Sequence, residues 1–443
     1  MRRRMRTTLT VTTAAALALP LTLGAVPAGA APAAAGDGTP AGAAAPALDE
    51  DSSSVARAVA EAVAQARREA SARTFVAPSE DAAATAGARD ALDQALADTV
   101  AGVPVGVVGR VDAPGLHWSG AEGTRRLDGR GPARPQDRFR AASNTKMMVS
   151  TLVLQEVEKG TWTLDTPVVE VVPEAAAVVP DAYEDDVTLE LLLTHRSGLP
   201  DHLSALAASR MTDPEDLDEF FEVLGEEYPV ADHLAAMDDL PWLFAPGTDV
   251  AYSNAGYVLL GAALERATGQ SVERLLEKRV FGPAGMRHSA FPDDPGLRGP
   301  FLHEAAYTGE LGAGWYGLDP FDPSLFGAAG AVTSTTADLR RFTESLVTGD
   351  LLEPATVTDV LTPRTVGSEV LPDYGLGVYR LPDPCQDGAW LYGHDGASFG
   401  TLSITLTSPD ADRQVTVALT GRDLTSVGSD LMTALVPALL ATC

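Results

Sequence analysis

Lysine is scarce in this chain of 443 residues, in which only Lys146, Lys159 and Lys278 are lysines and almost all positive side chains are arginines. Arginine stays protonated in proteins, whereas burial and neighbouring charge can lower the pKa of a lysine until its amine accepts a proton. The rarity of lysine therefore suggests that this residue type is used where a base is needed.

Positive charge as a whole is sparse, with 32 lysines and arginines against 61 aspartates and glutamates and a formal net charge of -29. Nucleic acid binding needs a basic face, so this balance argues against a nucleic acid partner. Long apolar runs are missing after the N-terminus, since residues 431–440 have roughly half the length of a membrane span and include Pro437. We therefore expect no integral membrane span in the mature chain.

Cysteine is limited to Cys385 and Cys443, which are too few ligands for a zinc site. After export to an oxidising compartment, a disulfide between them would restrain the unfolded chain by roughly 4 kcal/mol. Two free thiols are the alternative.

The N-terminus has the pattern of a secretory signal. Residues 1–6 include four arginines, an apolar run extends to Val26, and residues 28–30 form a signal-peptidase site. We expect residues 1–30 to be removed and the mature protein to be secreted to the cell envelope. A retained membrane anchor is the alternative, which the short run and Pro20 disfavour.

Residues 31–87 are expected to be an alanine-rich linker or pro-segment, because residues 31–47 contain mainly alanine, glycine and proline without a periodic apolar face. Residues 51–73 predict a helix whose alanine and valine face buries little surface. Residues 88–443 form the expected globular domain, in which strand patterns at both ends enclose helical patterns. This order predicts one large α/β (α+β) unit with a helical insertion.

The first of three motifs is Ser143-Asn144-Thr145-Lys146, at the start of a helical pattern that stops at Gly160. Positions i and i+3 share one helix face, so the Lys146 amine can reach the Ser143 hydroxyl, which is a poor nucleophile until a base takes its proton. No other lysine has a serine three places before it. A helix cap beside a surface lysine is the alternative.

The second motif is Tyr252-Ser253-Asn254, which contains one of the only two asparagines, Asn144 and Asn254. Tyr252 could shuttle the serine proton if Lys146 lowered its pKa, and Asn254 could bind a substrate amide with both ends of its side chain. A turn asparagine beside a packed tyrosine is the alternative.

The third motif is His394-Asp395-Gly396, at the edge of a predicted strand. Gly396 allows the backbone to approach a ligand, and His394 offers a donor or a partial positive charge there. A structural histidine before a turn is the alternative.

In this order and at these separations, the motifs resemble those of the serine β-lactamase and penicillin-binding protein family, which carries S-x-x-K, Y-x-N and K-T-G or H-x-G. The tyrosine and the third-motif histidine are most similar to class C-type D-alanyl-D-alanine carboxypeptidases and their esterase relatives. Similar stretches extend over residues 91–422, including LLLTHRSGLPDH, FAPGTDVAYSNAGYVLLGAALERATGQS, GAAGAVTSTTADLRRF and YGLGVYR. The resemblance implies an antiparallel sheet formed from both chain ends and flanked by helices, beside a mainly helical inserted subdomain.

The resemblance also implies roles at the matching positions. Ser143 would be the acylated nucleophile, Lys146 its base or proton relay, and Tyr252 the second proton-transfer group. The implied substrate-binding residues are Asn254, which would hold the substrate amide, His394, which would tune Tyr252 and the carboxylate end of the substrate, and Gly396 and Ala397. The backbone amides of Ser143 and Ala397 would form the oxyanion hole. Asp395 replaces the usual threonine and disfavours a carboxylate-bearing substrate, which keeps esters and amine-bearing peptides open.

A rival serine lies in the same region, because residues 396–400 spell G-x-S-x-G around Ser398. An α/β-hydrolase nucleophile elbow requires a helix after the serine and a histidine later in the chain. Here a strand pattern follows Gly400, and His394 is the last histidine. The histidines also lack the spacing of a metal site, which argues against a metallohydrolase. Acyl transfer to a serine implies no cofactor.

Together these patterns predict acyl transfer through an acyl-enzyme on Ser143, with water as the final acceptor. Lys146 can act as the base near neutral pH if its pKa falls from ~10.4 by about three units. The leading function that the resemblance implies is a carboxypeptidase, expected to be a monomer, on peptidoglycan stem peptides ending in D-Ala-D-Ala, with penicillins as acylating mimics. An esterase or β-lactamase on the same scaffold is second, and a non-catalytic penicillin-binding or wall-binding module is third.

Overall fold

A seven-stranded antiparallel sheet is the centre of the computed structural model, which describes residues 51–72, 82–214, 216–238, 240–297, 299–309, 314–368, 370–424 and 429–443. Its strand order is β2-β1-β11-β10-β9-β8-β7, so strands from the start of the domain pair with strands from its end. The predicted mixed fold, with an antiparallel sheet from both chain ends, is therefore confirmed. The predicted signal, residues 1–30, lies outside the described residues.

Central strands of this sheet are buried along their whole length. Valine, leucine, isoleucine and threonine predominate in them, as is typical of strands packed between two helical layers. The whole sheet consists of seven strands, of which β10 and β11 are buried at every residue. The seven are β1 (Gly106–Ala113), β2 (Leu116–Gly123), β7 (Asp373–Tyr374), β8 (Tyr379–Pro382), β9 (Trp390–Ala397), β10 (Thr401–Thr407) and β11 (Gln414–Thr420).

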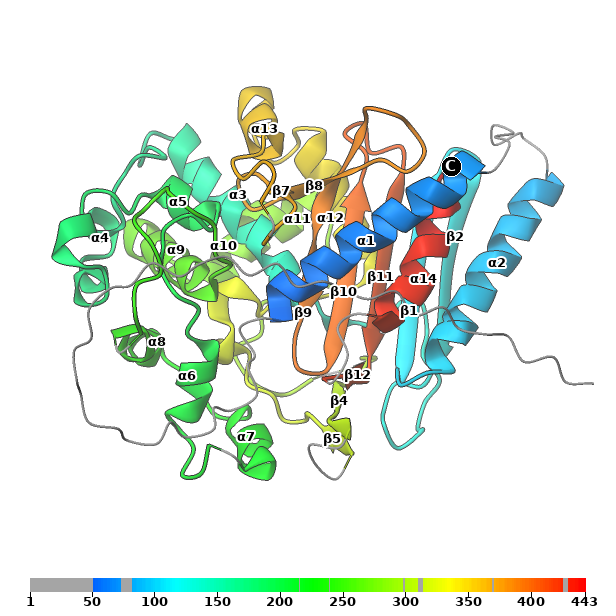
Figure 1. The fold of residues 1–443 in the computed structure, drawn as a ribbon, viewed down its shortest axis with the longest axis horizontal. Coiled ribbons are helices and arrows are strands. Elements are labelled where there is room, and N and C mark those ends of the chain that lie inside the picture. Colours follow the sequence, from blue (N-terminus) through cyan, green and yellow to red (C-terminus); the bar gives the residue numbers. More distant parts are fainter. Residues whose placement is uncertain are drawn as a thin grey trace, which may run out of the picture. The chain divides into compact units, whose positions relative to one another are not determined.

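Three helices cover the outer face of the sheet within the described ranges: α1 (Asp51–Ala72), α2 (Ala82–Val100) and α14 (Ser429–Leu440). In Figure 1, α14 lies between α1 and α2. Their apolar side chains share one core with alternate residues of the central strands, such as Ile404 and Val417. The first and last helices of the described residues, α1 and α14, therefore meet on this face.

The helix predicted over residues 51–73 is present as α1, but the expectation that it buries little is wrong. Val55, Val59 and Val63 are fully buried. Small alanine and valine side chains give the helix a smooth face, which packs closely on β8, β9 and α14. The packed unit therefore extends ahead of residue 88, where the globular domain was expected to begin.

The inner face of the sheet carries α3 (Thr145–Glu158) and α12 (Thr336–Val347). Helix α3 is buried on nearly all sides, as expected of a helix between a sheet and a helical region. The helical insertion contains α4 (Val168–Val171), α5 (Leu189–Leu193), α6 (Leu203–Ala208), α7 (Leu217–Val223), α8 (Val230–Asp238), α9 (Asn254–Thr268), α10 (Val272–Leu276) and α11 (Gly282–Ala284). The remaining elements are α13 (Pro354–Leu361) and the short strands β3 (Phe139–Arg140), β4 (Ala305–Tyr307), β5 (Trp315–Gly317), β6 (Thr333–Ser334) and β12 (Arg422–Asp423).

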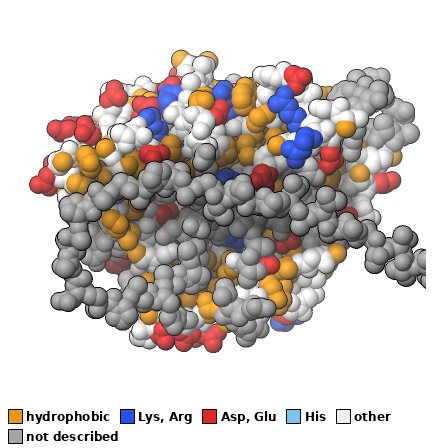
Figure 2. All heavy atoms as spheres, viewed as in Figure 1, with side chains coloured by type: hydrophobic (Ala, Val, Ile, Leu, Met, Phe, Trp, Pro, Cys, Tyr) orange, Lys and Arg blue, Asp and Glu red, His pale blue; other side chains and the backbone are white. Residues whose placement is uncertain are grey.

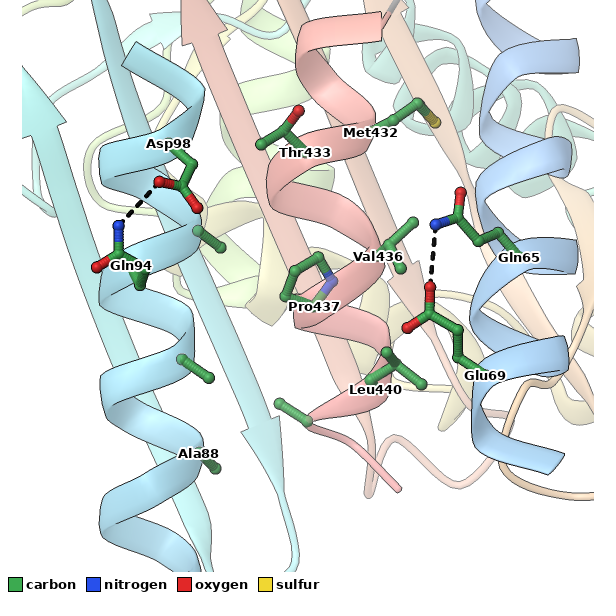
Figure 3. A pocket seen from close by; sticks show the side chains of 13 residues that line it. Gln65, Glu69, Ala88, Gln94, Asp98, Met432, Thr433, Val436, Pro437 and Leu440 are labelled. Atoms are coloured by element: carbon green, nitrogen blue, oxygen red, sulfur yellow. Dashed lines mark hydrogen bonds between the residues drawn. The ribbon is translucent and has the colours of Figure 1, made fainter. Parts of the chain in front are cut away.

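A groove of about 620 Å³ follows α14 on the outer layer (Figure 3). Met432, Val436 and Leu440 of α14 line it with apolar surface, and Gln65 of α1 and Gln94 of α2 lie on its two flanks. Because the groove is on the opposite side of the sheet from α3, it is separate from the three motifs.

The acidic side chains, which outnumber the basic ones, are spread over the surface instead of forming one patch in the view of Figure 2. Figure 2 shows Asp and Glu side chains scattered over one face, with Lys and Arg side chains in a few small groups. Within the described ranges, every helix is too short or too polar to traverse a lipid bilayer.

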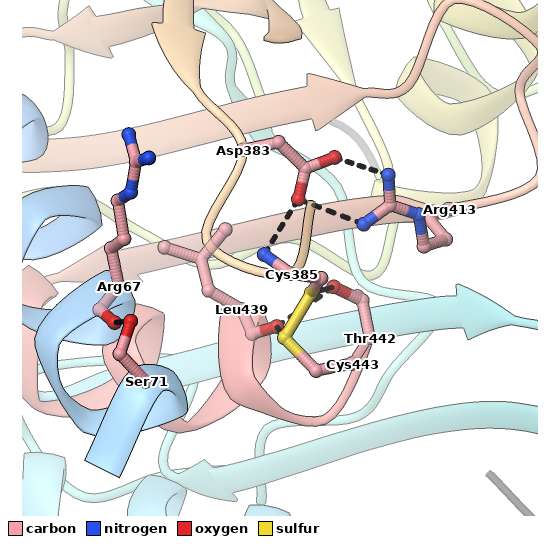
Figure 4. Close-up of a disulfide and its surroundings, with 8 residues drawn as sticks. All are labelled: Arg67, Ser71, Asp383, Cys385, Arg413, Leu439, Thr442 and Cys443. Carbon is pink, nitrogen blue, oxygen red and sulfur yellow. Dashed lines mark hydrogen bonds and ion pairs between the residues drawn. A yellow bond between two sulfur atoms is a disulfide. The ribbon is translucent and has the colours of Figure 1, made fainter. Parts of the chain in front are cut away.

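A disulfide joins Cys385, in the turn between β8 and β9, to Cys443 at the end of the chain (Figure 4). Asp383 lies beside it, accepts a hydrogen bond from the Cys385 amide at 2.8 Å and pairs with Arg413. The disulfide that the sequence left as one of two alternatives is therefore present. It ties the last turn of the outer layer to the edge of the sheet.

Replacing both cysteines with serine is expected to lower the free energy of unfolding by about 4 kcal/mol, because the unfolded chain regains the entropy of a 58-residue loop. Urea titration followed by circular dichroism measures the difference. Reduction of the wild-type protein should cause the same loss and should not affect the double variant. Equal stability of the two proteins contradicts the prediction.

Candidate active site

Ser143 lies in a strained turn against the inner face of the sheet. It belongs to the 3-10 helix η1 (Ala142–Asn144), which leads directly into α3, as the helical pattern predicted. Ala142 has φ 46°, a left-handed conformation that is costly for a residue with a side chain and is concentrated at functional sites. Asn144 Nδ2 donates to the Ala141 carbonyl and to Ser403 Oγ of β10, at 3.0 Å each, and so fixes the turn to the sheet.

Lys146 is fully buried and makes three hydrogen bonds. Its Nζ is 3.0 Å from Ser143 Oγ, 2.7 Å from Asn254 Oδ1 and 2.9 Å from the carbonyl oxygen of Ala329. Ala329 ends the 3-10 helix η7 (Gly327–Ala329). The contact expected from the i, i+3 spacing is present.

Burial lowers the pKa of Lys146 from 10.5 to about 7, although the carboxylates of Asp201 and Asp395 act in the opposite direction. The neutral amine is therefore populated near neutral pH.

The partners of Lys146 fix where a neutral amine directs its lone pair. Such an amine has two N–H groups and one lone pair. The Asn254 and Ala329 oxygens can only accept, so they take the two hydrogens, and the lone pair faces the Ser143 hydroxyl. The arrangement places a base in line with a nucleophile.

The Asn254 side chain is held at both ends. Its Oδ1 accepts from Lys146, while its Nδ2 and its backbone N–H both donate to Asp201 Oδ2, at 2.6 and 2.8 Å. The prediction that both ends of this amide bind a substrate did not include these protein partners, which use one of the two N–H groups of Nδ2 and one of the two lone pairs of Oδ1. Asn254 orients Lys146.

Tyr252 lies over the amine rather than beside it. Lys146 Nζ is 4.8 Å from the centre of the Tyr252 ring, and His195 stacks on that ring at 4.2 Å. Burial, followed by the Asp395 carboxylate, raises the pKa of Tyr252 well above its usual value. The Ser143 hydroxyl, which is near the phenol but makes no well-formed hydrogen bond with it, lowers that pKa by less. The condition under which Tyr252 would take the serine proton, a lowered pKa, is therefore not met, and the residue stays a phenol.

His394 is also occupied by protein groups. Its Nε2 is 2.9 Å from the Tyr374 hydroxyl, and its Nδ1 is 2.5 Å from the Asp395 carbonyl oxygen. A carbonyl only accepts, so Nδ1 carries the proton and Nε2 accepts from Tyr374. Burial, followed by Lys146, lowers the pKa of His394 to about 3. The imidazole of His394 is therefore neutral, and the expectation that it offers a partial positive charge is wrong.

Gly396 is the point at which β9 touches the serine turn. A Cβ at this position would lie 2.2 Å from the Ala141 carbonyl oxygen and 2.9 Å from Asn144 Nδ2. The absence of a side chain therefore permits a close approach, as predicted, but to the serine turn and not directly to a ligand.

Ala397 follows at the open edge of β9. Ser398 N–H donates to the Thr401 carbonyl across the turn, so the alternation of the ladder directs the Ala397 N–H away from β10. On that other side, the pairing of β9 with β8 ends at Gly393. The Ala397 amide is thus directed to an edge beside Ser143, where an oxyanion hole needs a donor.

Ser398 is held in a different environment from Ser143. Its buried Oγ donates to Glu304 and accepts from the Thr401 amide at 3.1 Å. The chain turns back through Phe399 and Gly400 directly into β10, where a nucleophile elbow needs a helix. The structure therefore disfavours Ser398 as a nucleophile, as predicted.

Four residues of the site went unpredicted. His195 and Asp201 lie in LLLTHRSGLPDH, so a similarity of sequence was their only signal. His195 Nδ1 accepts from the Ser253 amide at 3.1 Å and its ring supports Tyr252. Ala329 lies in GAAGAVTSTTADLRRF and contributes a backbone carbonyl, and Tyr374 begins YGLGVYR and contacts His394 from a separate strand. For these two residues as well, similarity of sequence was the signal, and it did not indicate the role.

Three comparisons relate the chain to known proteins. The Beta-lactamase family model matches residues 88–435. Penicillin-binding protein 4 of Amycolatopsis lactamdurans is 30% identical over 66% of this chain and 74% of its own length. Esterase EstB of Burkholderia gladioli is 35% identical over 48% of this chain, which spans 53% of the esterase. Among solved structures, a D-stereospecific amidohydrolase of Streptomyces sp. has a TM-score of 0.67 at 24% identity, over 78% of this chain and 97% of its own, a likeness of fold.

Proposed function

The chain belongs to the beta-lactamase family, and from this premise we propose that it is a serine hydrolase that cleaves a small ester or amide through an acyl-enzyme on Ser143. The observation that carries the proposal is the 3.0 Å contact between Ser143 Oγ and Lys146 Nζ, in which the other two partners of the amine are pure acceptors. A module that only binds its ligand has no need of a buried lysine with this lone-pair direction.

In the first step, Lys146 Nζ takes the hydroxyl proton while Ser143 Oγ bonds to the substrate carbonyl carbon. The backbone amides of Ser143 and Ala397 stabilise the negative charge that develops on the carbonyl oxygen. The bond to the leaving group then breaks, and the proton passes from Lys146, directly or through the Tyr252 hydroxyl, to the leaving oxygen or nitrogen. Water repeats these steps on the acyl-enzyme, which releases the acid and restores Ser143.

A substrate without a carboxylate beside the scissile bond fits the site best. His394 is neutral because its pKa is lowered to about 3, and Asp395 adds a buried acid in the same motif. A peptide that ends in a free carboxylate is repelled by this acid and gains no cation from the histidine. The predicted D-Ala-D-Ala carboxypeptidase activity is the second candidate, which the relationship to a penicillin-binding protein over 74% of its length favours.

A fluorophosphonate probe tests the acyl-enzyme proposal, because Ser143 Oγ would displace fluoride from phosphorus and keep the label. Peptide mapping by mass spectrometry should locate the label on Ser143. A label on Ser398, or none, overturns the proposal.

Side-by-side kinetics test the substrate class. The rate on a p-nitrophenyl ester should exceed the rate on a peptide ending in D-Ala-D-Ala, since the peptide brings a carboxylate towards Asp395. Faster cleavage of the peptide selects the second candidate.

Activity is expected to rise with pH through about 7, because Lys146 acts as the base only after it loses its proton. Burial in the folded protein lowers the pKa of this amine from 10.5 to about 7, so its neutral form predominates above about pH 7 and its protonated form below that pH. The rate of fluorophosphonate labelling should therefore be about a hundredfold lower at pH 5 than at pH 8. A rate without an inflection between pH 6 and pH 8 contradicts this expectation.

We also propose that the mature protein is exported and acts as a monomer. The signal pattern of residues 1–30 supports export. N-terminal sequencing of protein from the culture medium should find residues 1–30 removed, and light scattering measures the assembly state. A cell-bound chain with residue 1 intact contradicts export.

A further inference from the structure

Asp201 is a residue to which neither the predicted motifs nor the reaction steps above assign a role. We propose that Asp201 is a positioning residue: its carboxylate sets the orientation of the Asn254 amide and, through it, the direction of the Lys146 lone pair. The consequence for catalysis rests on the proposed function, whereas the orientation of the amide does not.

The carboxylate is held in a fixed place between two parts of the chain. Asp201 lies in the loop between α5 and α6, where its Oδ1 accepts from the Leu203 amide at 3.0 Å. Its Oδ2 accepts from both the backbone N–H and Nδ2 of Asn254. Ser253 Oγ donates to the Pro200 carbonyl at 3.1 Å and ties the same loop to the start of α9. The loop and the second motif therefore form one rigid unit.

Only one orientation of the Asn254 amide suits this carboxylate. A carboxylate only accepts, so the NH2 end of the amide must face Asp201 and the oxygen end must face Lys146. A flipped amide would place its oxygen against the carboxylate. It would also direct an N–H at the amine, where it would bind the lone pair that Ser143 needs. Asp201 thereby excludes the orientation that would disable the base.

Asp201 also adds charge to the surroundings of the amine. The groups that face Lys146 are Asp201 from the α5–α6 loop, His394 and Asp395 from β9, His195, and the rings of Tyr252 and Tyr257. Among these groups, the two aspartates raise the pKa of Lys146 and oppose the effect of burial. Loss of the Asp201 charge should therefore move the acid limb of the rate profile to lower pH.

The composition of the chain offers a direct measurement of the amide, because Asn144 and Asn254 are the only asparagines. Selective 15N labelling of asparagine side chains gives two NH2 signals, which an Asn254→Ala variant assigns. Asp201→Asn adds a third NH2 signal, so a double variant, Asp201→Asn with Asn254→Ala, identifies the Asn254 signal in this background. In Asp201→Asn, the Asn254 NH2 should lose at least tenfold in protection from hydrogen exchange, while the Asn144 NH2 keeps its protection. Unchanged protection of Asn254 overturns the proposal.

The catalytic consequence is measured by the rate of fluorophosphonate labelling from pH 5 to pH 9. Asp201→Asn should label about tenfold more slowly at pH 8, with its midpoint at lower pH. Asp201→Glu keeps the charge but displaces it, so it should lose protection at Asn254 and keep the wild-type midpoint. Asp185→Asn removes an exposed carboxylate as the matched control and should behave as wild type.

The outcomes separate the two proposals. A wild-type rate and midpoint in a folded Asp201→Asn protein, as judged by circular dichroism, overturn the role of Asp201 in catalysis. If Asp201→Asn does not fold, the protection of Asn254 in Asp201→Glu decides the orientation in its place. If wild-type protein is not labelled on Ser143, the proposed function fails, and the asparagine spectrum still decides whether Asp201 orients the amide.

Discussion

Lys146→Arg is expected to slow the labelling of Ser143 and substrate turnover by at least about a thousandfold at pH 8. Arginine stays protonated at this pH and has no lone pair for the serine proton. A guanidinium also has five N–H donors, whereas the acceptors around Lys146 Nζ are Asn254 Oδ1 and the Ala329 carbonyl. The same substitution therefore removes the base and disturbs the geometry that orients it.

Lys278→Arg is the matched control for this variant. Lys278 is exposed, and its Nζ contacts Gln270 at 3.1 Å, far along the chain from the motifs. Its labelling rate should stay within about twofold of wild type, as is usual for a surface substitution. Stopped-flow rates and thermal melting measure activity and folding in parallel. If Lys146→Arg keeps more than a tenth of the wild-type rate, another group must take the Ser143 proton.

Ser143→Ala should abolish labelling and lower turnover by about 10⁴-fold or more, since no covalent bond to the substrate can form. The loss should occur without a large change in stability, because Lys146 keeps two of its three partners, Asn254 Oδ1 and the Ala329 carbonyl, and an alanine side chain fits the same turn. Mass spectrometry of the intact protein and ester hydrolysis measure the two effects.

Ser398→Ala provides the matched comparison. Its hydroxyl donates to Glu304 and accepts from the Thr401 amide, so its removal should cost about 1–3 kcal/mol of stability. Turnover should remain within tenfold of wild type and labelling should persist. The reverse pattern, with an active Ser143→Ala protein and an inactive Ser398→Ala protein, would make Ser398 the nucleophile.

The parts of the site that depend on local geometry were predictable from the sequence. Ser143 and Lys146 are three residues apart on one helical turn, where the backbone alone brings the hydroxyl to the amine. The rejection of Ser398 was equally local, because the strand pattern after Gly400 already excluded an elbow. The order of the strand and helix patterns predicted a mixed α/β unit with a helical insertion, and the family resemblance of the motifs implied the antiparallel sheet from both chain ends.

The parts that depend on distant partners were not predictable. Asn254 is held by Asp201, 53 residues away, and Lys146 by a carbonyl 183 residues away. The pKa values of Tyr252 and His394 are set chiefly by burial, which becomes known only when the layers are packed. A motif identifies the side chains, but their protonation states depend on burial in the tertiary structure.

Helix α1 lies before the residues 88–435 that the family model matches, yet Val55, Val59 and Val63 cover strands β8 and β9. A recombinant chain trimmed to the family boundaries would expose an apolar strip that includes Leu381 and Leu391 to water. Such strips promote self-association and poor solubility. The starting residue for expression is therefore better chosen at residue 51 or earlier, from the packing of the sheet.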